Sequence, residues 1–179
     1  MAYCGARTIP LRLYVLFIFV LICVIHPSVF AKGRIVKIVV SGEHLSTPIE
    51  STSETVGQFG VWEGPGVVIG NVPQAKGFIA DWSKGVISER RNGLDRYKVS
   101  FYEGCKFTDS SACHSEEPDL AYVVFYEYDP SNGQGYVYLP GKGDEWYDLN
   151  VRSIYRRVEG NWFISTDEWQ AFVLPLIGA

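Results

Sequence analysis

The chain has 179 residues and a formal net charge of −4, and 47% of its residues are hydrophobic. This length fits one domain, and the acidic balance excludes a typical nucleic-acid-binding protein, which needs a basic face. The first 31 residues carry two arginines and no acid, with an apolar run from Leu13 to Ile25 followed by His26-Pro27. Together with the small residue Ala31, this pattern predicts a secretory signal peptide over 1–31 that is cleaved after Ala31.

Two alternatives to a cleaved signal stay open. The apolar run has 13 residues, whereas a membrane-spanning helix needs about 20, so we expect no stable span after cleavage. An uncleaved N-terminal helix that anchors the chain is the first alternative, and lipidation at Cys23 is the second. The favoured location is secreted or periplasmic.

Removal of residues 1–31 changes both the charge and the cysteine count. Residues 32–179 keep all 20 acidic residues but 14 of the 16 basic ones, so their net charge is −6. Cys4 and Cys23 leave with the signal, and Cys105 and Cys113 remain. In an oxidising compartment this pair is expected to form a disulfide, worth about 2–3 kcal/mol for so short a loop. Two free thiols are the alternative.

The first half of the mature chain reads as short strands separated by glycine- and proline-rich turns. A strand is predicted at 34–40, and residues 49–50 are expected to pair back onto it. A short helix should follow the cap-like sequence 51–54 and end near Phe59. Further short strands are predicted at 67–69, 77–82 and 86–90.

The second half has a clearer pattern. Alternating residues at 95–103 and the apolar run 120–128 predict two strands, of which the second is central because both its faces are apolar. The Asn132-Gly133 turn leads into a strand at 134–139. A hairpin is predicted from 150–157 to 161–165, and Thr166 should cap a closing helix over 167–174. The predicted fold class is α+β: a single domain over 32–179, rich in antiparallel β-sheet, with one or two short helices.

Four segments resemble a known pattern: KIVVSGEHLSTPIE (37–50), FIADWSKG (78–85), QGYVYLPGKGDEWYDLNVRSI (134–154) and EGNWF (159–163). On these segments the chain resembles a family of small, secreted or membrane-associated bacterial proteins to which no activity is assigned. The resemblance implies an exported bacterial domain, and it implies no chemistry. The cysteine-bearing loop 104–119 is not part of the pattern.

Several catalytic motifs are missing from the sequence. It has no G-x-S-x-G, no H-E-x-x-H and no Walker loop. No cofactor and no metal are expected. His44 is read as a solvated turn residue rather than a base. The acidic loop with Asp109, Glu116, Glu117 and Asp119 lacks the alternation of a calcium loop.

Asp81-Trp82 is the one candidate for catalysis. A carboxylate beside an indole is a common arrangement in sugar sites, and a nearby apolar ring raises the pKa of an acid. A glycosidase needs a second carboxylate, for which Glu127, Asp144 and Glu145 are candidates. The favoured alternative is that Asp81 caps a turn and Trp82 packs in the core.

A tyrosine stripe is the candidate for binding. By the two-residue period of a strand, Tyr122, Tyr126 and Tyr128 share one face, and Tyr136 and Tyr138 share one face of the next strand. An exposed stripe would bind a glycan or a peptide. A buried stripe would be cross-strand packing, which is the favoured interpretation.

The sequence therefore favours an exported, non-enzymatic domain that binds a glycan or an envelope protein. The alternative is a carboxylate-dependent hydrolase of envelope or environmental polysaccharide. The separation and exposure of the named side chains distinguish the two.

Overall fold

A computed structural model describes residues 33–104 and 117–179. The predicted signal peptide, Cys23 and the predicted Cys105–Cys113 pair lie outside these residues, as do Asp109 and Glu116. The described residues form one compact body that begins at Gly33.

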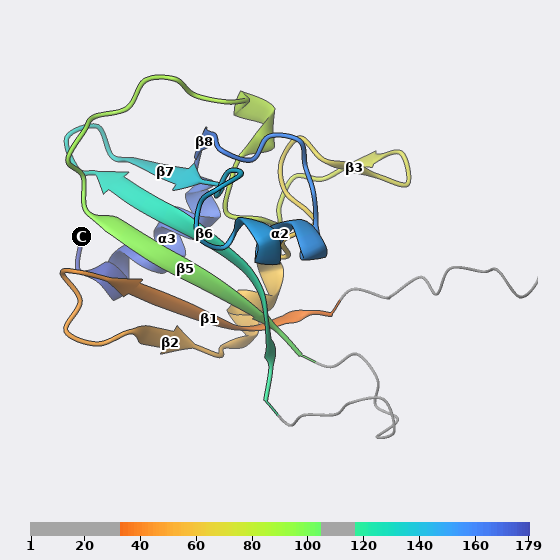
Figure 1. Cartoon of the computed structure of the whole chain (residues 1–179), viewed down its shortest axis with the longest axis horizontal. Coiled ribbons are helices and arrows are strands. Elements are labelled where there is room, and N and C mark those ends of the chain that lie inside the picture. The colour runs from red at the N-terminus through yellow and green to blue at the C-terminus, as the bar shows by residue number, and fades with distance from the viewer. Residues whose placement is uncertain (1–32, 105–116) are drawn as a thin grey trace, which may run out of the picture. The chain divides into compact units, whose positions relative to one another are not determined.

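The body is built on one six-stranded antiparallel sheet, drawn across the centre of Figure 1. Its strands are β1 (Ile35–Gly42), β2 (Ile49–Ser51), β5 (Arg96–Glu103), β6 (Asp119–Asp129), β7 (Gln134–Tyr138) and β8 (Trp162–Ile164). Their order in the sheet is β2-β1-β5-β6-β7-β8, and every neighbouring pair is antiparallel. The predicted α+β class is thereby confirmed.

Strand β5 shows how the sheet acquires two different faces. Tyr97, Val99 and Phe101 are buried, and they alternate with Arg96 and Lys98, which point to the opposite side. The register with β6 places Tyr97 opposite Tyr126. We call the side of Tyr97 and Tyr126 the core face and the other side the open face.

Helix α3 (Asp167–Ile177) covers the core face and lies behind the sheet in Figure 1. Thr166 caps it as predicted, because its hydroxyl accepts from the backbone N–H of Trp169. Trp169 is fully buried and meets Phe59 edge-on, with ring centroids 5.3 Å apart. The helix continues past the predicted end at 174 through Pro175 and stops at Gly178, whose φ of 72° is left-handed.

The predicted hairpin of 150–157 with 161–165 is wrong. Residues Tyr147–Ser153 form helix α2, and β8 pairs with β7 instead. The reason is a tertiary contact: the Asn150 side chain accepts from the backbone N–H of Val123 at 2.8 Å and donates to its carbonyl at 2.7 Å. Asn150 of helix α2 thus supplies hydrogen-bond partners for the β6 backbone at Val123, which lies beyond the end of β7.

The remaining elements are short. A 3₁₀ turn, η1 (Glu54–Gln58), occupies the predicted helix, and β3 (Val68–Ile69) pairs with β4 (Val72–Pro73) in a separate hairpin. Residues 77–82 and 86–90 are not strands. They contain only the single bridges Ala80–Ser165 and Ile87–Trp162 and the start of the turn η2 (Trp82–Lys84). Among the helices of the described residues, none has the length and apolar character to cross a membrane.

Candidate binding site on the open face of the sheet

The open face carries one row of side chains that crosses five strands. The register places Ser41 of β1 opposite Lys98 of β5, and Lys98 opposite Phe125 of β6. Phe125 in turn lies opposite Tyr138 of β7, and Tyr138 opposite Trp162 of β8. We call the last four of these residues, Lys98, Phe125, Tyr138 and Trp162, the cross-strand row. All four side chains are partly exposed.

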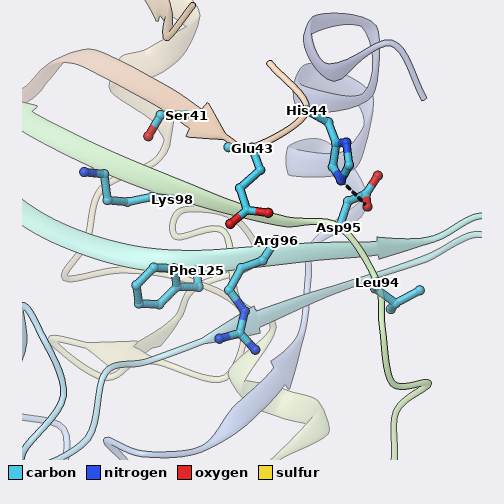
Figure 2. A pocket seen from close by; sticks show the side chains of 9 residues that line it. Ser41, Glu43, His44, Leu94, Asp95, Arg96, Lys98 and Phe125 are labelled. Carbon is cyan, nitrogen blue, oxygen red and sulfur yellow. Dashed lines mark ion pairs between the residues drawn. The ribbon is translucent and has the colours of Figure 1, made fainter. Parts of the chain in front are cut away.

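Two hollows on this face meet at Arg96 and Phe125. The first, of about 590 Å³, lies at the β1–β5 end of the sheet. Figure 2 shows its lining, with Lys98, Phe125 and Arg96 on neighbouring strands and Glu43 reaching toward them. The second, of about 410 Å³, is lined by Arg96, Phe125, Tyr138, Asp144, Glu145 and Trp162. Together we call them the groove; each has the size of a small-molecule site.

The aromatic side chains of the row are close enough to form one surface. The ring centroids of Phe125 and Tyr138 are 6.5 Å apart with planes tilted by 34°, and those of Tyr138 and Trp162 are 5.0 Å apart at 37°. These distances are typical of favourable aromatic pairs. The rings therefore form a shallow, continuous apolar strip rather than three separate contacts.

A buried carboxylate orients two arginines around Trp162. Glu127 is 2% exposed and accepts from Nε of Arg96 at 2.9 Å and from Arg90 through its other oxygen. The Arg90 guanidinium lies 3.8 Å from the Trp162 ring centroid, and that of Arg96 lies 5.5 Å away. Charge-assisted pairs of this kind fix the donor geometry, and both cations also interact with the ring.

At the far end of the groove, Tyr138 is held by Asp144. Its hydroxyl donates to Oδ2 of Asp144 at 2.6 Å, and the same oxygen accepts from the backbone N–H of Gly141 at 2.8 Å. The bond from Tyr138 and that from Gly141 lower the pKa of Asp144 below its ordinary value. Desolvation, together with Asp144, raises the pKa of Tyr138 to about 12. Tyr138 thus keeps its proton, Asp144 stays ionised, and the ring is fixed in place.

Asp81 and Trp82 both have partners within the chain. Asp81 caps η2, because its Oδ1 accepts from both the backbone N–H and the hydroxyl of Ser83. Trp82 stacks on Phe78 with planes 4° apart and donates to the carbonyl of Glu63 at 3.1 Å. Asp81 is thus the N-cap of η2, and Trp82 is partly buried against the core.

The acids considered as the second catalytic carboxylate either are bound to other side chains or line a different hollow from Asp81. Glu127 is buried between two arginines, and Asp144 is bound to Tyr138. Asp81 lines a different hollow, at the start of α3, whereas Glu145 lines the groove. The hollow of Asp81 is also lined by Asp167 and Glu168 of α3, and by none of the groove's carboxylates.

The tyrosines do not form a single platform. Tyr122 and Tyr126 are fully buried on the core face, where desolvation raises the pKa of Tyr122 to about 12 and also raises that of Tyr126. Tyr128 is partly buried against the same core. Tyr136 and Tyr138 lie on the opposite, open face, and Tyr136 is only 7% exposed. Of the five, Tyr138 belongs to the groove.

Phe125, Trp162, Arg96 and Lys98 were not among the site residues predicted from the sequence. A signal for one of them, Phe125, was present: it alternates with Tyr126 in a run that is apolar on both faces, and Asn132-Gly133 sets the register that pairs it with Tyr138. Trp162 could not be placed in the row, because its partner strand was misassigned.

His44, which was considered as a base, has an acidic partner. His44 and Asp95 form an ion pair at 3.0 Å, and both side chains are more than half exposed. Among residues 33–104 and 117–179, no group of three or more His, Cys, Asp or Glu side chains is arranged to hold a metal ion.

Comparisons with known proteins found no relative. No protein-family model matches the chain, and no curated protein or solved structure is similar to it. The resemblance of its four segments to exported bacterial proteins therefore stays a prediction.

Proposed function

We propose that the chain is an exported, non-enzymatic binding protein that holds an oligosaccharide in the groove. The observation that carries this proposal is the strip of Phe125, Tyr138 and Trp162, partly exposed and continuous across three strands. Binding sites combine an apolar, aromatic lining with a few polar groups that fix orientation. Here Arg96 and Lys98 supply donors, and Asp144 and Glu145 supply acceptors.

The shape of the groove favours a chain of sugar rings. Each sugar ring has an apolar C–H face that packs on an aromatic ring and an edge of hydroxyls that both donate and accept hydrogen bonds. The aromatic strip offers successive rings 5.0 and 6.5 Å apart. The cations and acids of the groove flank it, so one ligand can contact both.

Recognition of a peptide as an added strand is less well supported. That mode needs an exposed sheet edge. The edge strands β2 and β8 have three residues each, and the outer side of β8 already contacts Ile87 through a bridge. A protein ligand would have to bind through the side chains of the open face.

The hydrolase alternative finds less support in the described residues. A glycosidase needs one carboxylic acid that keeps its proton at working pH. The pKa of Asp144, the groove acid that contacts the aromatic strip, is lowered rather than raised. Asp81 accepts two hydrogen bonds from Ser83, and the acids that share its hollow, Asp167 and Glu168, lie in the first turn of α3.

The location is proposed from the sequence. A chain whose signal is cleaved after Ala31 begins at Lys32, and N-terminal sequencing of protein recovered from the producing cell tests this. A chain that starts at Met1 would reject cleavage and favour the anchored alternative.

The binding proposal is tested on a glycan array, followed by titration of the best ligand. Trp162→Ala and Phe125→Ala should each weaken binding about tenfold or more, because each removes one ring of the strip. Tyr155→Ala is the matched control, since Tyr155 is 59% exposed and does not line the groove. A far-UV spectrum equal to that of the wild type shows that each variant is folded.

Three outcomes would contradict the proposal. The first is the absence of any glycan bound at millimolar concentration. The second is a glycan bound equally well by both groove variants. The third is release of reducing ends from a bound glycan, with loss of this release in Asp81→Asn or Glu145→Gln, which would establish the hydrolase instead.

A further inference from the structure

The β3–β4 hairpin is an apolar projection from the body. It extends away from the sheet in Figure 1. Val68, Ile69 and Val72 are 62%, 48% and 60% exposed, and they make up three of the five large hydrophobic side chains that are exposed in the described part of the chain. Single exposed apolar residues are normal, but a cluster of them on one projecting element marks a binding surface.

The hairpin holds these side chains outward. Gly70 and Asn71 at its apex have φ values of 55° and 66°, which is the conformation of a type I′ turn and matches the twist of paired strands. Its base is closed by two backbone bonds, from Gln74 to Val67 at 2.7 Å and from Val67 to Gly64 at 3.0 Å. The apolar tip is therefore preformed.

The hairpin is also free of charge. Residues 64–75 contain no Asp, Glu, Lys, Arg or His, and the first charged residues on either side are Glu63 and Lys76. The amide of Gln74 is used within the hairpin, since it donates to the carbonyl of Val72 at 3.1 Å. On an acidic protein, an apolar tip without charge is suited to contact an apolar environment that is bounded by neutral polar groups.

We infer that this hairpin inserts its tip into the interface of a lipid bilayer, by hydrophobic contact and without a requirement for anionic lipid. Val68, Ile69 and Val72 would enter the acyl boundary, and Asn71 at the apex would contact headgroups or interfacial water. The net charge of −6 over residues 32–179 opposes attraction to an anionic surface. Apolar area removed from water is then the driving force.

A protein partner fits the hairpin less well. Each strand has two residues, and Pro73 has no backbone N–H to donate, so the edge is a poor template for an added strand. Specific protein interfaces also use charged or aromatic anchors, and residues 64–75 contain neither. The inference does not depend on the oligosaccharide proposal, since the hairpin does not line the groove.

The first test is flotation of the full protein with neutral phosphatidylcholine vesicles. We expect binding that is unchanged between low and high salt. The double variant Val68→Ser/Ile69→Ser should lower the partition coefficient about thirtyfold, because two apolar side chains are lost. Val86→Ser is the matched control: Val86 is 49% exposed but lies outside the hairpin, and its replacement should leave partition unchanged.

A second measurement is needed in case the N-terminal apolar segment is retained and binds vesicles by itself. Ile69→Trp and Val86→Trp are compared with vesicles that carry nitroxide-labelled acyl chains. We expect strong quenching of the added tryptophan only in Ile69→Trp.

The inference is overturned by equal quenching of the two tryptophan variants, or by vesicle binding that requires anionic lipid and falls with salt. It is also overturned if the wild type forms a dimer that the double serine variant does not form, because the hairpin would then bind a second copy of the chain.

Discussion

The Nε of Arg96 donates to Oε1 of Glu127 at 2.9 Å, so a half-exposed cation of the groove is fixed by a carboxylate that is 2% exposed. Glu127 also binds Arg90, which lies over Trp162. One buried acid thus sets the position of two arginines and, through them, of one end of the aromatic strip.

Glu127→Gln should therefore both destabilise the fold and weaken ligand binding. Removing one partner of a buried ion pair costs about 3–5 kcal/mol when the other charge stays buried. Arg96 is 50% exposed and can reach water, so we expect a smaller loss, of about 1–3 kcal/mol, in the free energy of unfolding by urea. Glu89→Gln, at an exposed position, is the control and should change stability by less than about 0.5 kcal/mol. If Glu127→Gln lowers the free energy of unfolding no more than Glu89→Gln does, the ion pairs of Glu127 with Arg90 and Arg96 contribute nothing to stability.

Asn150→Ala should be among the most destabilising substitutions of a polar residue. Asn150 is 1% exposed and makes two hydrogen bonds to the backbone of Val123. Its loss leaves a buried N–H and a buried carbonyl unpaired, which costs about 1–3 kcal/mol for each unsatisfied group.

Urea unfolding measures this loss, with Asn92→Ala at an exposed position as the control. Hydrogen exchange gives a second readout, because the amide of Val123 should lose protection in Asn150→Ala and keep it in the control. A Val123 amide that stays equally protected would contradict the role given to Asn150.

Tyr138→Phe should raise the pKa of Asp144. The pKa of Asp144 lies below its ordinary value of 3.8, and the hydrogen bond from Tyr138 is the largest cause. Because the folded-state pKa is depressed, this bond stabilises the fold above the unfolded pKa of 3.8, and its contribution is lost as the pH falls through the folded value. NMR titration of the Asp144 carboxyl carbon measures the shift.

Tyr136→Phe is the control for this titration, since no hydrogen bond joins Tyr136 to Asp144 among the described contacts. Tyr136→Phe should leave the midpoint of the Asp144 titration unchanged. If Tyr138→Phe also leaves it unchanged, the Tyr138–Asp144 bond does not form in solution, and the ring of Tyr138 is not fixed as described.

The central strands could be predicted because their signals are local. Residues 95–103 alternate clearly, and Asn132-Gly133 specifies a tight turn, so β5, β6 and β7 follow from short-range patterns. Helix α2 could not be predicted in this way. Its conformation is stabilised by the contact of Asn150 with Val123, which is 27 residues earlier in the chain.

The groove was harder to predict than the fold. In the run 120–128, Phe125 and Tyr126 are equally apolar, and only the position of α3 decides that Tyr126 is buried and Phe125 partly exposed. Residue type alone therefore pointed to the tyrosines, of which Tyr122 and Tyr126 lie in the core. Glu127 was considered as a catalytic acid, but the arginines that bury it come from two other segments of the chain.

The cross-strand row draws one residue from each of β5, β6, β7 and β8, and the core lies on the opposite side of the same strands. The proposed ligand contacts and the packed core thereby occupy alternate positions along the same strands. Substitutions at 98, 125, 138 or 162 are therefore expected to change the surface that the groove offers while the packing around Trp169 keeps its shape. Under the proposed function, the sheet would be a scaffold whose ligand preference can change one strand at a time.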